Sequence, residues 1–174
     1  MQEQAAIDDI RRSIETAVAS LRAADARTEA LAEFVPRRRV LKLFPRAASF
    51  TAIGPVWRLG VFLLDEAGTL RTVGTTTRAV APGYPGFQSV SAEERRGYRA
   101  AAFAGPFEVG ETVNFGTQAI ELTADALVDS PGPLFISAGR PLVRWNPSAT
   151  SDSATDFPAY LAERAELLSR TFES

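Results

Sequence analysis

The first 35 residues carry mostly apolar side chains that recur every seven positions in two columns. One column holds Ile7, Ile14, Leu21, Thr28 and Val35, and the other holds Ile10, Ala17, Ala24 and Leu31. Charged residues fall outside these columns, and neither glycine nor proline interrupts the pattern before Pro36. The spacing predicts a long amphipathic helix over residues 1–35.

The apolar stripe of this helix needs a surface to pack on, and two surfaces fit it. One is the sheet or the C-terminal helix of the same chain, and the other is the same helix of a second subunit. The alanines of the second column would let a partner helix approach closely. Both arrangements stay open on the sequence alone.

Residues 49–146 are rich in β-branched and aromatic side chains with the alternation typical of strands. The stretches 56–64 and 69–80, separated by the turn residues 65–68, predict a long hairpin. Three further stretches should extend the same antiparallel sheet: residues 112–122, 134–137 and 142–145. A turn over residues 138–141 would join the last two of them.

Two more helices are predicted from their end signals. Ser91 and Glu94 have the spacing of a capping box, so that a helix should run over residues 91–104 until Gly105 and Pro106 stop it. Asp156 is expected to cap the last helix, over residues 156–173, with a proline in its first turn.

The remaining segments read as connections. Residues 37–46 are basic and apolar, which predicts a connector with a short strand, and residues 148–155 predict a flexible surface loop. With the helices and strands above, the chain is predicted to be an α+β protein. Its mainly antiparallel sheet would be packed by helices, with a long N-terminal amphipathic helix and a C-terminal helix.

The composition agrees with one globular domain. The chain has 174 residues, of which 45% are hydrophobic and 23% are charged, enough to bury a core. No apolar run approaches the length of a membrane span, and the N-terminus is polar and acidic where a signal peptide would be basic and then apolar. We therefore expect a single domain over residues 1–174, a cytoplasmic location and no membrane partner.

Two residue types that carry much of enzyme chemistry are absent. The chain has neither cysteine nor histidine, which excludes thiolate nucleophiles, imidazole bases and the metal sites built from them. Phosphate-binding and dinucleotide-binding glycine motifs are missing too, so we expect no metal and no cofactor. The net charge of −2 argues against nucleic acid as a partner. Any catalysis would have to use carboxylate, tyrosine or arginine side chains.

The candidate ligand-binding residues are Arg78, Tyr84, Arg95, Arg99 and Asn114. Arg95 and Arg99 lie one helical turn apart and repel each other unless a carboxylate or a bound anion lies between them. Glu108 or Glu111 of the same chain is one such carboxylate, and a bound anion is the alternative. Tyr84 lies in a loop rich in proline and glycine and would either cover a pocket or pack that loop onto the core.

The composition also carries a resemblance. Lys42 is the single lysine, arginine and alanine are abundant, and the stretches at residues 74–79 and 110–115 stand out. In these features the chain resembles small proteins of high-GC, actinomycete-type bacteria. The resemblance implies a bacterial protein and no particular activity.

Two functional hypotheses follow. The first is a binding or assembly module without enzymatic activity, a homodimer or other homo-oligomer associated through the N-terminal helix. The second is a protein that binds a small anionic ligand, or an enzyme that acts on one with arginine, glutamate and tyrosine side chains.

Overall fold

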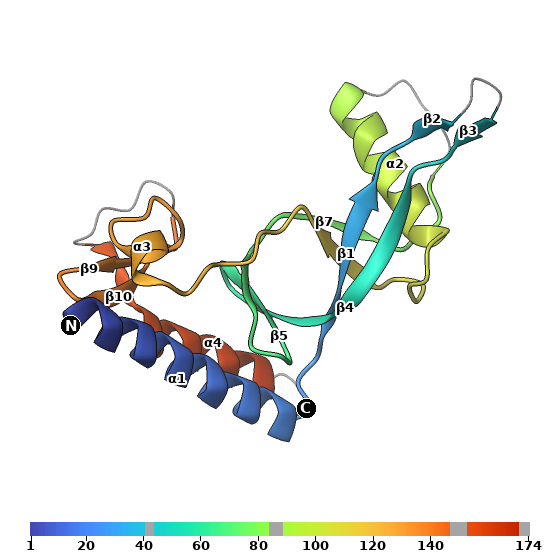
Figure 1. Ribbon diagram of the computed structural model, residues 1–174. Helices are drawn as coiled ribbons and strands as arrows, with labels where there is room; N and C mark the ends of the chain where they lie inside the picture. The colour runs from blue at the N-terminus through green and yellow to red at the C-terminus, as the bar shows by residue number, and fades with distance from the viewer. Residues whose placement is uncertain (41–43, 84–88, 147–152, 171–174) are drawn as a thin grey trace. The chain divides into compact units, whose positions relative to one another are not determined.

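The computed structural model describes residues 1–40, 44–83, 89–146 and 153–170, and it confirms the predicted α+β class (Figure 1). The helices of this part of the chain are α1 (Gln2–Ala23), α2 (Val90–Phe103), α3 (Ala124–Leu127) and α4 (Phe157–Arg170). None of them combines the length and the apolar character that a membrane span requires.

The strands form one large mixed sheet and two small antiparallel ones. They are β1 (Glu29–Val35), β2 (Arg38–Val40), β3 (Phe44–Arg46), β4 (Ser49–Leu59), β5 (Phe62–Asp65), β6 (Leu70–Thr72), β7 (Thr75–Arg78), β8 (Thr112–Phe115), β9 (Leu134–Ser137), β10 (Arg140–Val143) and β11 (Thr155–Asp156). The large sheet has the order β6-β5-β4-β1-β8-β7, in which β1 and β8 are parallel. The small sheets have the orders β11-β10-β9 and β2-β3. The prediction that β9 and β10 extend the main sheet is therefore wrong.

The chain divides into two compact units. Unit 1 comprises Met1–Thr28, Trp57–Thr72 and Gln118–Ser174, and unit 2 comprises Glu29–Val56 and Val73–Thr117. Each unit has its own cluster of buried apolar side chains, and β4 runs from unit 2 into unit 1. That residues 1–174 form a single domain remains a prediction, which this division into compact units does not test.

The N-terminal helix is shorter than predicted. It ends at Ala23, and the amide groups of Asp25 and Ala26 donate to the carbonyls of Arg22 and Leu21, the hydrogen-bond pattern of a Schellman motif. Asp25 has a φ of 48°, the left-handed conformation for which this motif usually recruits glycine. Because an aspartate and not a glycine occupies this position, the sequence pattern contained no sign that the helix ends here.

The last third of the predicted helix is a strand. Residues 29–35 form β1, which pairs with β4 on one side and with β8 on the other. Leu31, assigned above to the apolar stripe of a helix, is buried in unit 2 instead. Long-range pairing on both edges of this segment overrides its local helical spacing.

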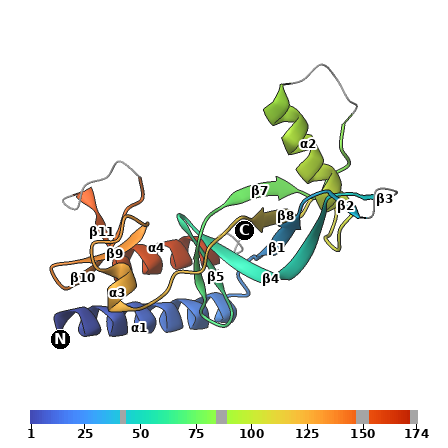
Figure 2. The same ribbon diagram turned by 45° about the horizontal axis from the view of Figure 1, so that its top comes forward.

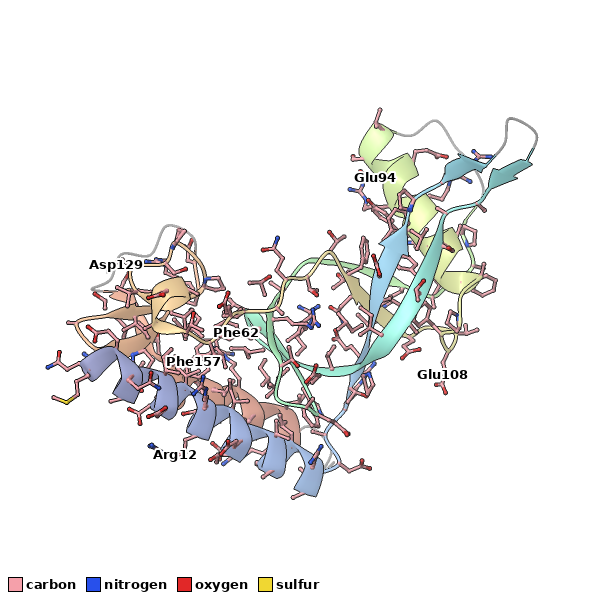
Figure 3. All side chains as sticks on the ribbon, in the orientation of Figure 1. Arg12, Phe62, Glu94, Glu108, Asp129 and Phe157 are labelled. Carbon is pink, nitrogen blue, oxygen red and sulfur yellow. The ribbon has the colours of Figure 1, made fainter. Side chains whose placement is uncertain are left out.

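Unit 1 buries the apolar stripe of α1 within the chain. The fully or nearly fully buried residues of this stripe are Ala6, Ile7, Ile10, Ile14, Ala17, Val18 and Leu21. α1 packs against α4, which buries Phe157, Tyr160 and Leu161 in the same core. Phe157 also meets the ring of Phe62 edge-on, with the ring centroids 5.8 Å apart (Figure 3). Of the two packing surfaces that fitted the stripe, the structure uses the one inside the chain.

Helix starts were predicted with mixed success. α4 confirms its cap, because Oδ2 of Asp156 accepts a hydrogen bond from the Ala159 amide. α2 begins at Val90 with Ser89 as its N-cap and has no side-chain cap, so the capping box of Ser91 and Glu94 is wrong. The Glu94 carboxylate instead accepts a hydrogen bond from the hydroxyl of Tyr98. Residues 171–173 of the predicted last helix lie outside the described residues.

The predicted long hairpin is shorter in the structure. The turn at residues 65–68 is confirmed by the hydrogen bond from the Gly68 amide to the Asp65 carbonyl, but its arms are only β5 and β6. β7 leaves this hairpin and pairs with β8, which ends at Phe115 rather than near residue 122. Ala138 and Gly139 alone form the turn between β9 and β10.

The two segments read as connections are described only in part. The basic segment contains the short antiparallel pair β2 and β3, and residues 41–43 between them lie outside the described residues. The same holds for residues 148–152, most of the predicted flexible loop. Thr155, at the end of that prediction, belongs to β11.

Gly60 connects β4 to β5 and tests the packing of unit 1. Its φ is 65°, and a Cβ atom placed on it would overlap the Tyr160 hydroxyl, which accepts a hydrogen bond from the Val61 amide at 3.0 Å. We expect Gly60→Ala to lower the free energy of unfolding by about 2 kcal/mol, because the substitution adds backbone strain to this overlap. Urea denaturation followed by circular dichroism measures the change.

Gly97→Ala is the matched control. Gly97 lies inside α2, and a Cβ atom placed on it meets no atom within 4 Å. This variant should gain about 0.5–1 kcal/mol from its higher helix propensity. Equal losses in the two variants would contradict the described contact between Gly60 and Tyr160.

Candidate functional site

A groove of about 470 Å³ in unit 2 is lined by residues of β7 and α2. These two elements pack against each other, and both are labelled in Figure 2. The described residues that line it are Thr75, Thr76, Thr77, Arg78, Val80, Arg95, Tyr98, Arg99 and Thr112. β7 contributes a run of hydroxyl groups and one guanidinium group, and α2 contributes two guanidinium groups. The groove therefore presents hydrogen-bond donors and positive charge.

The groove brings together three of the five candidate residues, Arg78, Arg95 and Arg99. Asn114 does not line it. Its side chain is completely buried on β8, and its Nδ2 atom donates to Oε2 of Glu29 at 2.8 Å and to the carbonyl of Ala30 at 3.1 Å. The geometry assigns Asn114 a structural role between β8 and β1. Tyr84, the fifth candidate, lies outside the described residues.

The helical spacing of α2 explains the position of its two arginines. Ala101 and Ala102 are buried against the sheet of unit 2. Tyr98 packs beside them, with its ring edge-on to Phe34 at a centroid distance of 5.0 Å. Arg95 and Arg99 lie one turn apart next to this packed face, so that both guanidinium groups reach the groove.

β7 forms the other wall because it ends the large sheet. It pairs with β8 on one side, and in the described part of the chain no strand pairs with its other side. Thr75, Thr76 and Arg78 are exposed, as expected for an edge strand of short polar and charged residues. Arg78 is paired with Thr112 across the two strands, so the two side chains lie on the same face of the sheet.

The three groove arginines form no ion pair with any residue that the structure describes. Glu108 and Glu111 were the carboxylates expected to neutralise Arg95 and Arg99. Glu111 instead accepts a hydrogen bond from the Glu108 amide at 2.9 Å, and Glu108 lies beyond the C-terminal end of α2 (Figure 3). Of the two explanations for the arginine pair, the internal carboxylate is thus not observed.

Neighbouring charges on α2 are neutralised within the helix. Glu93 accepts hydrogen bonds from the guanidinium group of Arg96, one of them from Nε at 3.1 Å. This hydrogen bonding lowers the pKa of Glu93 and raises the pKa of Arg96. Arg96 differs in this respect from Arg95 and Arg99, and it does not line the groove.

Tyr98 is the aromatic hydroxyl of the groove. It donates to Oε1 of Glu94 at 2.7 Å, and this hydrogen bond raises the pKa of Tyr98, with desolvation and the glutamate charge acting in the same direction. The phenol therefore stays protonated at neutral pH, and its proton is engaged by Glu94. Its oxygen can accept a hydrogen bond from a ligand but has no free proton to give.

The groove residues that the structure describes are suited to holding an anion. The described lining residues include no carboxylate to act as a proton acceptor. In the described ranges there is also no cluster of acidic side chains that could hold a metal ion. Guanidinium groups and threonine hydroxyls together suit an anion with several acceptor oxygens.

Comparisons of the chain with protein-family models, with curated proteins and with solved structures find no match. Any function of the groove must therefore be inferred from the residues of this chain. Tyr98 and Thr112 line it although the sequence did not single them out. Tyr98 follows Arg95 by three residues, a spacing that puts both on adjoining parts of one helix surface, whereas only the pairing of β7 with β8 brings in Thr112.

Substitutions at Asn114 and at Thr76 should distinguish a residue that stabilises the fold from one that only lines the groove. We expect Asn114→Ala to lower the free energy of unfolding by about 2 kcal/mol, because it leaves the Ala30 carbonyl without this partner and removes buried volume. Its partner across the strands, Thr76, is exposed on the edge, and Thr76→Ala should change stability by less than about 0.5 kcal/mol. Urea denaturation of both variants tests this difference, and comparable losses would contradict the structural role of Asn114.

Proposed function

We propose that this protein binds an anionic ligand in the groove between β7 and α2. One observation carries the proposal: Arg78, Arg95 and Arg99 share one groove and have no ion-pair partner among the described residues. Arg95 and Arg99 lie one helical turn apart, and their like charges repel each other. An anion bound between them would replace this repulsion with charge-assisted hydrogen bonds. The ligand would take the place that a glutamate of the same chain was expected to fill.

The chemical class of the ligand follows from the donors. The planar guanidinium group matches the two oxygens of a carboxylate or phosphate group, and three such groups favour a ligand with more than one negative charge. A volume of about 470 Å³ falls in the usual range of small-molecule sites. Because the arginines are exposed, the interaction should weaken as the salt concentration rises.

Binding has better support than catalysis. No described lining residue is a carboxylate, the proton of Tyr98 is engaged by Glu94, and the sequence has no histidine or cysteine. The non-enzymatic binding module of the first hypothesis and the anionic ligand of the second therefore combine into one proposal. We include in it the expectation of a cytoplasmic bacterial protein.

Self-association through the N-terminal helix has less support. Ile7, Ile10 and Leu21 are buried in the core of unit 1. The side chains that suggested pairing with a second subunit's helix already pack against α4 and its neighbours. A homo-oligomer would need another surface. We therefore place the proposed function in the groove.

Charge removal on α2 tests the proposed function. We expect Arg95→Gln and Arg99→Gln each to raise the dissociation constant for the ligand about tenfold, because each removes a charge-assisted hydrogen bond. Isothermal titration calorimetry at low salt measures this with citrate, pyrophosphate and a glutamate-rich peptide as probes.

The control variant is Arg96→Gln on the same helix. Its guanidinium pairs with Glu93 and does not line the groove, so binding should change less than twofold although the change in net charge is the same. Two results would count against the proposal: equal weakening by all three substitutions, or no binding of any probe to the unaltered protein.

A further inference from the structure

The outer edge of β7 has backbone groups with no strand to pair with. The Ala79 amide donates to the Glu111 carbonyl at 3.0 Å, and the Ala79 carbonyl accepts from the Gly110 amide at 2.9 Å. Ala79 thus directs both of its backbone groups toward the chain segment on the β8 side. Because these directions alternate along a strand, Thr76 and Arg78 direct their amides away from β8, toward the open edge. The Arg78 carbonyl already accepts a hydrogen bond from the Val80 amide at 2.9 Å.

An open edge of this kind is a template for another strand. Proteins usually cover such edges or block them with proline, bulges or inward charges. β7 is short and has Arg78 at its end, but none of its four residues is proline, and Thr75 and Thr76 are exposed. The groove lined by Arg95 and Arg99 is also lined by the residues of this strand. A ligand in the groove could therefore contact both the backbone donors of β7 and the guanidinium groups of α2.

We infer that the ligand is an extended acidic peptide segment that adds to β7 as a further strand beneath α2. This inference rests on the proposed function, since it names the class of the anion that the groove binds. A compact anion would engage the guanidinium groups but would leave the outward amides of Thr76 and Arg78 and the Thr76 carbonyl without a strand partner. A peptide supplies both a complementary backbone and carboxylates.

The geometry sets the length and pattern of the peptide. β7 has four residues, which correspond to about 13 Å of extended chain at about 3.3 Å per residue. Side chains of an added strand alternate between the two faces of the sheet, so only every second residue faces α2. Acidic residues two positions apart should therefore meet Arg95 and Arg99, and adjacent acidic residues should not.

Backbone methylation tests strand addition directly. The probe is a fluorescent six-residue peptide with glutamate at its second and fourth positions and threonine or valine elsewhere, titrated with the full-length protein by fluorescence anisotropy. We expect methylation of one set of alternate amides to weaken binding about tenfold or more, because it removes a donor to β7. Methylation of the other set should change the affinity less than threefold. A peptide of the same composition with adjacent glutamates should bind about tenfold more weakly.

Each outcome separates the two proposals. If citrate or pyrophosphate binds in a manner sensitive to Arg95→Gln, while both methylated peptides bind alike, strand addition is wrong and the anion site stands. If the peptide binds the doubly substituted Arg95→Gln and Arg99→Gln protein as tightly as the unaltered one, the anion site itself is wrong. Alternation in the methylated peptides together with loss in the doubly substituted protein supports both.

Discussion

Burial of the α1 stripe inside unit 1 determines which surfaces of this protein remain for function. Ile7, Ile10 and Leu21 are at most 1% exposed, and a fully buried aliphatic side chain contributes about 1.5–3 kcal/mol. Detaching α1 to offer this face to a second subunit would forfeit several such contributions. The clearest pattern in the sequence thus explains the stability of unit 1. We therefore propose the polar groove of unit 2, and not the α1 stripe, as the recognition surface.

Local signals in the sequence predicted the parts of the fold whose hydrogen bonds are local. The Asp156 cap, the turn after Asp65 and the strand at residues 134–137 are specified by neighbouring residues, and all three are present. β1 is the opposite case. Its residues continue the spacing of a helix, but they become a strand because β4 and β8 pair with both of its edges. Pairing between distant segments is not encoded in a periodicity.

In the candidate site too, local spacing predicted some features, and contacts between distant segments decided the others. Arg95 and Arg99 could be paired from helical spacing, and the structure brings Arg78 to them because β7 packs beside α2. Asn114 looked equally suited as a polar residue in a predicted strand. Only the tertiary structure shows that its amide is engaged by Glu29 and Ala30. Sequence spacing indicates which side chains share a face, whereas their remaining hydrogen-bonding capacity depends on the folded neighbours.

Chemical-shift mapping tests most directly whether recognition occurs along β7 and α2. Two-dimensional ¹H–¹⁵N NMR spectra would be recorded while an acidic peptide is added to the labelled protein. We expect the shifts to concentrate at the backbone amides of Thr76 and Arg78 and at the side-chain Nε groups of Arg95 and Arg99, with the α1 amides unchanged. Shifts that follow α1 and leave β7 unaffected would contradict this proposal.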